Sequence, residues 1–183
     1  MELTKAKTIA DGTISKLRPF CKTGKCEIAG SIRRGTADVH DIDIVCIPIS
    51  HAFYALLPRL GNVVSRGDKI IKLDLLDGNG KVIVSQGKPF CVDIYIATEA
   101  TWATLLLIRT GSKEHNVKLC TIAKSKGMKL HADGSGLTLL TKGNSQAMFG
   151  GDSQIEEHPI SCDTETAIFA ALGLPYKSPA ERE

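Results

Sequence analysis

The sequence predicts an α+β fold made of two small lobes that share a core. A chain of 183 residues suits either one domain or two such lobes. Its hydrophobic fraction of 43% is enough to bury a substantial interior. Strand-like runs rich in β-branched residues gather before residue 97, whereas helical patterns predominate after it.

Both helices and strands are expected in the first 105 residues. Apolar residues recur on one side of residues 4–20, and Pro19 ends that helical pattern. A second apolar stripe predicts a helix over residues 51–60, and glycines flank a turn at residues 30–35. The expected strands cover residues 25–30, 41–47, 62–65, 69–76, 81–85 and 90–96.

The rest of the chain is expected to form helices around one hairpin. Ser112 is a good N-cap for one helix, and Asp163 or Thr164 can cap the last one. The predicted elements are helices over 99–109 and 113–126, a hairpin of 128–131 with 137–140, a long polar loop over 141–161, and a final helix ending at 171.

Two carboxylates on the strand 41–47 carry the main chemical signal. Asp41 and Asp43 lie two positions apart, and the side chains of a strand alternate between its faces. Both carboxylates therefore point to the same face, where they repel each other unless a cation lies between them. This spacing favours a divalent metal site. The plain alternative is a solvated Asp-x-Asp pair on an edge strand.

A Gly-Ser turn precedes these carboxylates. Its backbone N–H groups and the Ser31 hydroxyl can bind phosphate oxygens, and Arg34 can add charge-assisted hydrogen bonds. An anion cradle beside metal-binding carboxylates indicates a nucleoside triphosphate held on Mg²⁺. The alternative is an ordinary turn with no ligand.

A third carboxylate lies in the strand 90–96. Asp93 is the one acidic residue of this apolar run. A lone buried carboxylate is costly unless a charge neutralises it. Two interpretations fit this position, a further metal ligand or a structural aspartate satisfied by a neighbouring group.

Two motifs resemble those of the family X DNA polymerases. The first is Gly-Ser-Ile-Arg-Arg-Gly at 30–35, followed after a short spacer by Asp-Ile-Asp-Ile at 41–44. The second is Thr-Gly-Ser-Lys-Glu-His-Asn at 110–116, which follows the Val-Asp strand that carries Asp93. The resemblance covers roughly residues 26–183, interrupted by 141–161.

The resemblance implies a nucleotidyltransferase palm over residues 1–105, with a mixed twisted sheet and helices. A small α/β C-terminal lobe over 106–183 would select the nucleotide. The implied activity is that of a DNA-directed DNA polymerase that fills short gaps in DNA repair, by transferring a nucleotide from a dNTP to a primer 3′-hydroxyl. Asp41, Asp43 and Asp93 would be the catalytic residues and the ligands of two Mg²⁺ ions, with Mn²⁺ as a substitute.

The same resemblance assigns the other site residues and the partners. The implied nucleotide-binding residues are Gly30, Ser31, Arg34, His40, Gly111 and Asn116. The implied DNA-binding residues are Lys113, Lys118 and Lys124. The expected partners are a dNTP and gapped or primer–template DNA, bound by a monomer.

Two other functions compete with this one. A template-independent terminal nucleotidyltransferase would use the same chemistry on a DNA 3′ end. A catalytically silent DNA-end-binding protein would keep only the fold. The intact set of three carboxylates argues against the silent protein.

Composition sets further limits. A net charge of +3 permits a nucleic-acid partner without requiring one. No apolar run approaches the ~18 residues of a membrane span, and the N-terminus lacks the pattern of a signal peptide. The six cysteines form no Cys-x-x-Cys pair, which favours free thiols in an intracellular compartment, either cytoplasm or nucleus or nucleoid.

The chain also departs from the family. About one helix and a loop precede the first motif, so we expect no N-terminal lyase or helix-hairpin-helix module. Relatives place two aromatic residues before Thr-Gly-Ser and a basic residue four positions after the asparagine, where this chain has Ile108, Arg109 and Cys120. A cysteine cannot make an arginine's charge-assisted contact, which predicts low fidelity unless Lys118 or Lys124 replaces it.

Overall fold

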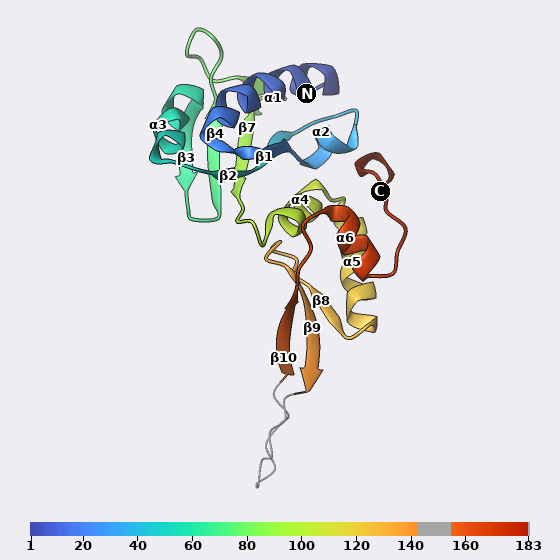
Figure 1. Cartoon of the computed structure of the whole chain (residues 1–183). Helices are drawn as coiled ribbons and strands as arrows, with labels where there is room; N and C mark the ends of the chain where they lie inside the picture. Colours follow the sequence, from blue (N-terminus) through green and yellow to red (C-terminus); the bar gives the residue numbers. More distant parts are fainter. Residues whose placement is uncertain (143–154, 183) are drawn as a thin grey trace.

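The computed structural model describes residues 1–142 and 155–182 and shows two lobes arranged end to end (Figure 1). One lobe holds a five-stranded sheet and the N-terminus. The other holds helices and a three-stranded sheet that extends away from the first lobe. The C-terminal residues return to lie near α2 (Gly30–Arg34). This arrangement confirms the predicted α+β class.

The first sheet is mixed, as predicted. Its strands follow the order β1-β2-β7-β4-β3. Strands β2 and β7 run parallel, and every other neighbouring pair runs antiparallel. The bounds are Cys21–Ile28 for β1, Asp41–Pro48 for β2, Gly61–Arg66 for β3, Ile70–Leu75 for β4 and Cys91–Ile96 for β7.

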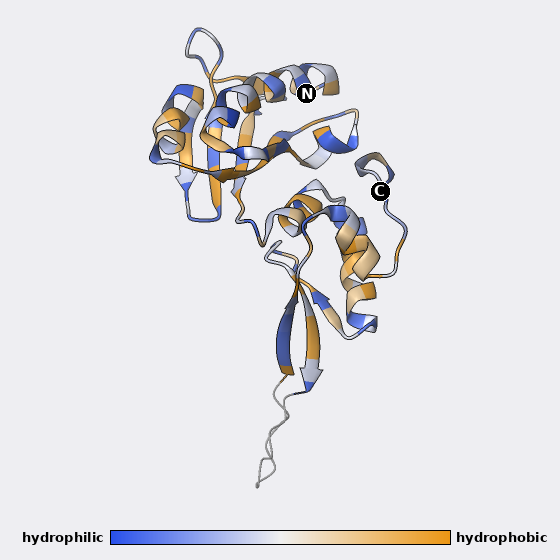
Figure 2. Ribbon diagram, in the orientation of Figure 1, coloured by the Kyte–Doolittle hydropathy of each residue, from blue (hydrophilic) through white to orange (hydrophobic). Residues whose placement is uncertain are grey.

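Helices α1 (Leu3–Leu17) and α3 (His51–Leu60) pack on one face of this sheet. Proline ends α1, which passes into a short 3-10 turn over Arg18–Phe20. Alternation along β2 sends Ile42 and Ile44 into this core. Figure 2 shows orange, apolar segments in the strands of this sheet and blue, polar segments between them. The intervening residues of β2 therefore face the opposite side of the sheet, toward the second lobe.

A second buried core lies between the three helices and the small sheet of the second lobe, and it also includes Ala29, Val45, Tyr95 and Ala97 of the first lobe. These helices are α4 (Trp102–Thr110), α5 (Lys113–Ser125) and α6 (Glu165–Ala171). Ser112 caps α5, because its hydroxyl accepts a hydrogen bond from the His115 backbone N–H at 3.2 Å. Thr164 caps α6 by accepting from Ala167 N–H at 3.1 Å, so Thr164 rather than Asp163 is the N-cap.

The small sheet confirms one prediction and corrects another. Strands β8 (Met128–Leu130) and β9 (Leu137–Lys142) form the predicted hairpin. The prediction of a polar loop over 141–161 is wrong at both ends, because β9 reaches Lys142 and Ile155–Ile160 form strand β10, which pairs antiparallel with it. Backbone pairing to β9 stabilises β10 although its side chains are mostly polar and exposed. Residues 143–154 of that predicted loop lie outside the described residues.

Three local predictions also need correction. The turn at 30–35 contains the one-turn helix α2. The strand predicted over 25–30 begins earlier, at Cys21. The strand predicted over 81–85 shrinks to β5 (Val84–Ser85), paired with β6 (Lys88–Pro89), because this segment leaves the sheet between β4 and β7 and finds few backbone partners.

The described residues contain neither a disulfide nor a membrane-spanning helix. All six cysteines are free thiols there, as the sequence predicted. Among residues 1–142 and 155–182, no helix has the length and apolarity that would let it cross a membrane.

A buried ion cluster joins the two lobes. Arg33 of α2 donates to both oxygens of the Glu165 carboxylate, at 2.8 and 2.7 Å, and also to Thr110 Oγ1 at 2.7 Å. Arg182, whose side chain is fully buried, donates to Glu165 Oε1 at 2.6 Å. Burial by itself would raise the pKa of Glu165, but the hydrogen bonds from the two arginines outweigh it and hold that pKa below its ordinary value. One carboxylate therefore ties α2 of the first lobe to α6 of the second.

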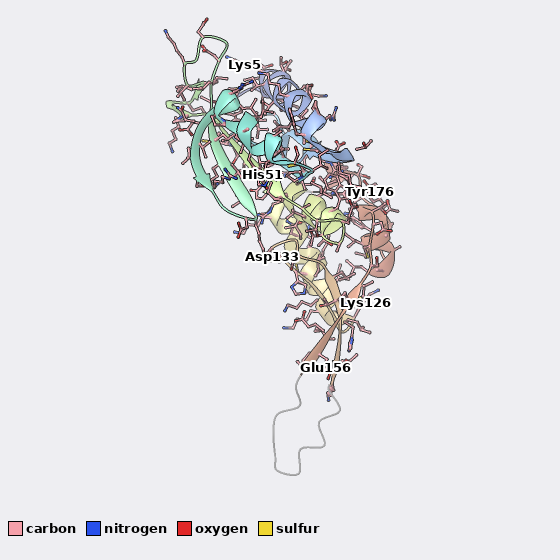
Figure 3. The ribbon with its side chains drawn as sticks, turned by 60° about the vertical axis from the view of Figure 1, so that its left-hand side comes forward. Lys5, His51, Lys126, Asp133, Glu156 and Tyr176 are labelled. Atoms are coloured by element: carbon pink, nitrogen blue, oxygen red, sulfur yellow. The ribbon has the colours of Figure 1, made fainter. Side chains whose placement is uncertain are left out.

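Glu165→Ala should destabilise the protein strongly. The change leaves two guanidinium groups facing each other with no counter-charge, which costs about 3–5 kcal/mol in buried ion pairs. Urea denaturation followed by circular dichroism measures the free energy of unfolding. Glu156→Ala is the matched control, because Glu156 is exposed on β10, far from the lobe that holds the five-stranded sheet (Figure 3). Equal losses in the two variants would contradict a special role for Glu165.

Candidate active site between the two lobes

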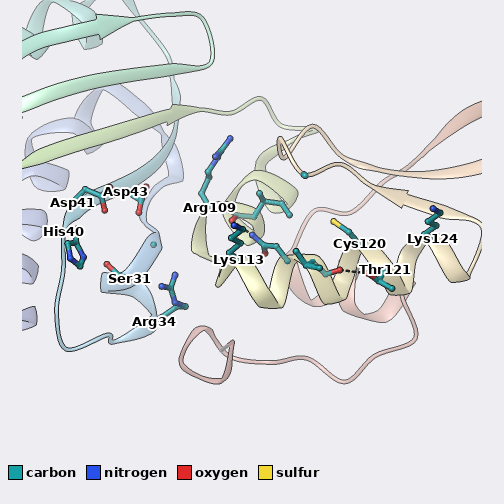
Figure 4. A pocket seen from close by; sticks show the side chains of 16 residues that line it. Ser31, Arg34, His40, Asp41, Asp43, Arg109, Lys113, Cys120, Thr121 and Lys124 are labelled. Carbon is teal, nitrogen blue, oxygen red and sulfur yellow. Dashed lines mark hydrogen bonds between the residues drawn. The ribbon is translucent and has the colours of Figure 1, made fainter.

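The predicted carboxylates come together through the pairing of β2 with β7. In this parallel register, Asp43 lies opposite Asp93, and Asp41 lies opposite Cys91. Alternation along both strands places these side chains on the face that turns toward the second lobe. Figure 4 shows Asp41 and Asp43 on one side of a cavity and Arg109 and other residues of the second lobe across from them.

These carboxylates disfavour one another's ionised forms. Burial raises the pKa of Asp43 to about 7, with the charges of Asp41 and Asp93 adding to the effect. The pKa of Asp41 is also raised, first by burial and then by Asp93. A half-buried cluster of like charges fits a bound cation, because the cation would remove this repulsion. The donor set of hard carboxylate oxygens suits Mg²⁺ or Mn²⁺.

The three carboxylates do not converge on a single point in this structure. Within residues 1–142 and 155–182, no group of three or more His, Cys, Asp or Glu side chains is close enough to hold a metal ion as it stands. Asp93 Oδ2 instead pairs with the Lys72 ammonium and lies 3.5 Å from the Tyr95 hydroxyl. The sheet therefore places the side chains as expected, and the three-carboxylate metal site remains a prediction.

Gly30 lies directly against the Asp43 carboxylate. A Cβ at position 30 would lie 1.9 Å from Asp43 Oδ2, and the backbone there has φ +61°. Both facts require glycine, since side chains rarely adopt this φ and none would fit beside the carboxylate. The motif glycine thus lets α2 and the Asp43 carboxylate approach each other, whether or not it also contacts a nucleotide.

All six predicted nucleotide-binding residues line one cavity of about 730 Å³. Asp41, Asp43, Lys113 and Lys124 line it as well. Asp93 and Lys118 do not. Asp93 lines a neighbouring cavity of about 430 Å³ together with Lys72 and Tyr95, and Arg109 lines both cavities.

Arg34 and Gly111 meet across the lobes. The Arg34 guanidinium donates to the Thr110 backbone carbonyl, and a Cβ on Gly111 would lie 3.1 Å from Arg34 Nη1. Gly111 has φ +72°, so its lack of a side chain meets a backbone requirement and a contact requirement together. Arg34 is therefore held at the cavity wall by the second lobe.

Asn116 and His40 differ in how they are held. Asn116 Nδ2 donates to the Ile108 carbonyl at 2.8 Å, while its buried Oδ1 has no partner among the described residues. Asn116 lines the cavity, so other atoms of its side chain can contact a ligand there. His40 is largely exposed at the cavity rim, 3.9 Å from Asp38.

Sequence reasoning missed the roles of three cations. Arg33 closes the Glu165 cluster, Arg109 stacks on the Tyr95 ring at 4.3 Å, and Lys72 pairs with Asp93. The second arginine of the Gly-Ser motif was a usable signal for Arg33. A lysine inside the apolar strand 70–75 was a usable signal for Lys72, by the same logic that singled out Asp93.

Comparison with known proteins finds DNA polymerases among the relatives of this chain. Residues 105–183 match the model of the family described as DNA polymerase beta thumb. DNA polymerase lambda of Rattus norvegicus is 30% identical over 171 residues, which cover 86% of this chain and 28% of that protein. The DNA polymerase/3′-5′ exonuclease PolX of Bacillus subtilis (strain 168) is 29% identical over 172 residues, which cover 91% of this chain and 26% of that protein.

The chain resembles the DNA polymerases of family X over most of its length. It spans little more than a quarter of the length of these two relatives. The fold agrees as well, because a crystal structure of Leishmania infantum polymerase beta in a ternary P/T complex superposes with a TM-score of 0.74 at 23% identity. That match covers 100% of this chain and 76% of the other chain.

Gly30→Ala should abolish nucleotide incorporation, because the new methyl group would push the Asp43 carboxylate out of place. We expect activity to fall at least about a hundredfold, a loss comparable with removal of a group that stabilises the transition state. Primer extension measures it.

Gly35→Ala is the matched control. Gly35 ends α2 at φ +79°, and no other heavy atom lies within 4 Å of the point that a Cβ would occupy, so this variant meets the same backbone strain without the clash. It should lose about 1 kcal/mol of stability and keep its activity. Retained activity in Gly30→Ala would show that Asp43 needs no such close approach.

Proposed function

We propose that this chain carries the polymerase activity of the family that it resembles, transferring a nucleotide from a dNTP to a primer 3′-hydroxyl in short-gap filling. The observation that carries the proposal is the parallel register of Asp43 with Asp93. That register, with Asp41, aligns three carboxylates beside a cavity that also holds Ser31 and Arg34. Such a transfer depends mainly on positioning and charge stabilisation, which these groups can supply.

Each residue has a distinct part in this proposal. Asp41, Asp43 and Asp93 would hold two Mg²⁺ ions, whose chemistry is to lower the pKa of the primer hydroxyl and to offset the triphosphate charge. The Ser31 hydroxyl and the Arg34 guanidinium would bind phosphate oxygens of the dNTP. Asn116 would bind the base or sugar, and Gly111 would let the backbone approach the sugar.

The two lobes would divide this work. We propose a palm over residues 1–105 and a nucleotide-selecting lobe over 106–183, which the thumb match at 105–183 supports. Lys113, Lys118 and Lys124 are exposed on α5 and would bind DNA phosphates. The free thiols support an intracellular location, and the proposed unit is a monomer.

Asp43→Asn and Asp93→Ala should each abolish incorporation while leaving the fold intact. Either change removes a metal ligand and also relieves repulsion between carboxylates, so stability should not fall sharply. We expect a loss of at least about a hundredfold in primer extension on gapped DNA with Mg²⁺. Glu156→Gln, which removes an exposed charge on β10, should retain activity. Substantial activity in either aspartate variant would exclude that residue from the metal site.

Template use separates this proposal from its alternatives. Extension of a gapped duplex far above that of a bare single strand would support a template-directed polymerase. Equal extension of both would support a terminal transferase. DNA binding with no incorporation under any metal would support a silent DNA-end-binding protein.

Cys120 bears on how strictly the template is followed. Its thiol donates to the Leu130 carbonyl at 3.4 Å while the residue lines the nucleotide cavity. Lys124 also lines that cavity and Lys118 does not, so Lys124 is the one of the two lysines that could replace an arginine contact. The thiol is a weak donor, and burial raises its pKa.

Cys120→Arg should therefore increase discrimination against mismatched nucleotides. A gained charge-assisted hydrogen bond is worth about 1.5–3 kcal/mol, or roughly tenfold or more in relative rate. Single-nucleotide insertion of correct and incorrect dNTPs measures the change in the natural chain, in Cys120→Arg and in Lys124→Met. If the natural chain already matches the arginine variant and Lys124→Met loses discrimination, Lys124 supplies the contact and the prediction for Cys120 fails.

A further inference from the structure

Lys72 lies in the same cross-strand row as two of the carboxylates. Strand β4 pairs with β7 so that Lys72 faces Asp93, and Asp93 in turn faces Asp43 on β2. The Lys72 ammonium forms an ion pair with Asp93 Oδ2. A monovalent side-chain cation therefore binds the oxygen that a metal ligand would offer.

The two partners differ in their access to solvent. The Asp93 side chain is 11% exposed, whereas that of Lys72 is 46% exposed. Lys72 also lines a small cavity of about 240 Å³ with Asp41, Asp74 and Cys91. The lysine can swing into water on its flexible stem, whereas the carboxylate, fixed in the central strand β7, cannot follow it.

We propose that Lys72 is a positioning residue that holds Asp93 until a divalent metal displaces it. The inference rests on the proposed function, in which Asp93 is a metal ligand. An ammonium group and a divalent cation compete for the same carboxylate oxygen, and repulsion between the two cations drives the lysine outward. The Lys72 side chain thus keeps a buried carboxylate neutralised without metal and sets how tightly metal binds.

A structural ion pair would behave differently. If Lys72 only stabilised the sheet, its removal would lower stability and leave metal affinity unchanged. If Lys72 is displaced on binding, its removal tightens metal binding, because no ion pair then needs to be broken. Metal affinity without nucleotide or DNA separates these two cases and does not depend on activity.

The experiment is Mn²⁺ titration of the chain, with free ion followed by electron paramagnetic resonance at slightly alkaline pH. Lys72→Met should bind Mn²⁺ about tenfold more tightly than the natural chain, the ratio expected for loss of one charge-assisted hydrogen bond. Lys72→Arg keeps the cation and should restore the natural affinity. Lys22→Met removes the same charge from an exposed pair with Glu99 in the same lobe and should change nothing.

Asp43→Asn, titrated in parallel, distinguishes a failure of the inference on Lys72 from a failure of the proposed function. If Asp43→Asn loses Mn²⁺ binding and Lys72→Met binds no more tightly than the natural chain, the proposed function stands and the inference on Lys72 is overturned. If Asp43→Asn binds as the natural chain does, both are overturned. Circular dichroism checks folding, and Lys72→Gln makes the same comparison if the methionine variant does not fold.

Discussion

The structure depends most on the carboxylate of Glu165, which lies between Arg33 and Arg182 and fixes the second lobe to α2. Helix α2 makes two further contacts within the same few residues. Gly30 lies against Asp43, and the Arg34 guanidinium donates to the Thr110 backbone carbonyl. A shift of α2 would therefore disturb the carboxylate, the cavity wall and the lobe contact together. The cluster places two guanidinium groups on one largely buried carboxylate, so it supplies a fixed geometry more than a large net stability.

The candidate site balances charges that would otherwise repel. Three carboxylates share one face of the sheet, and burial with mutual repulsion raises the pKa of Asp43. Two side-chain cations border them, Lys72 on Asp93 and Arg109 on the ring of Tyr95. These two cations offset part of the negative charge of the acidic cluster.

Local signals predicted much of the fold and of the site. The six residues predicted to bind the nucleotide all line one cavity, and N-cap chemistry marked the start of α5 at Ser112. The polar segment after residue 141 was the main error, because an exposed ribbon such as β10 is stabilised by backbone pairing and has no apolar alternation to reveal it. The segment 81–85 was misjudged for the opposite reason, since its strand-like residues lie outside the main sheet.

The sequence by itself determined that Asp41 and Asp43 share a face, because the period of a strand is a local property of the backbone. It also determined that Asp93 needed a neutralising partner. Only the tertiary structure decided that this partner is Lys72 and that Arg33 reaches Glu165, 132 residues along the chain. Strand register and lobe contacts come from the packing of distant segments, which no local pattern encodes.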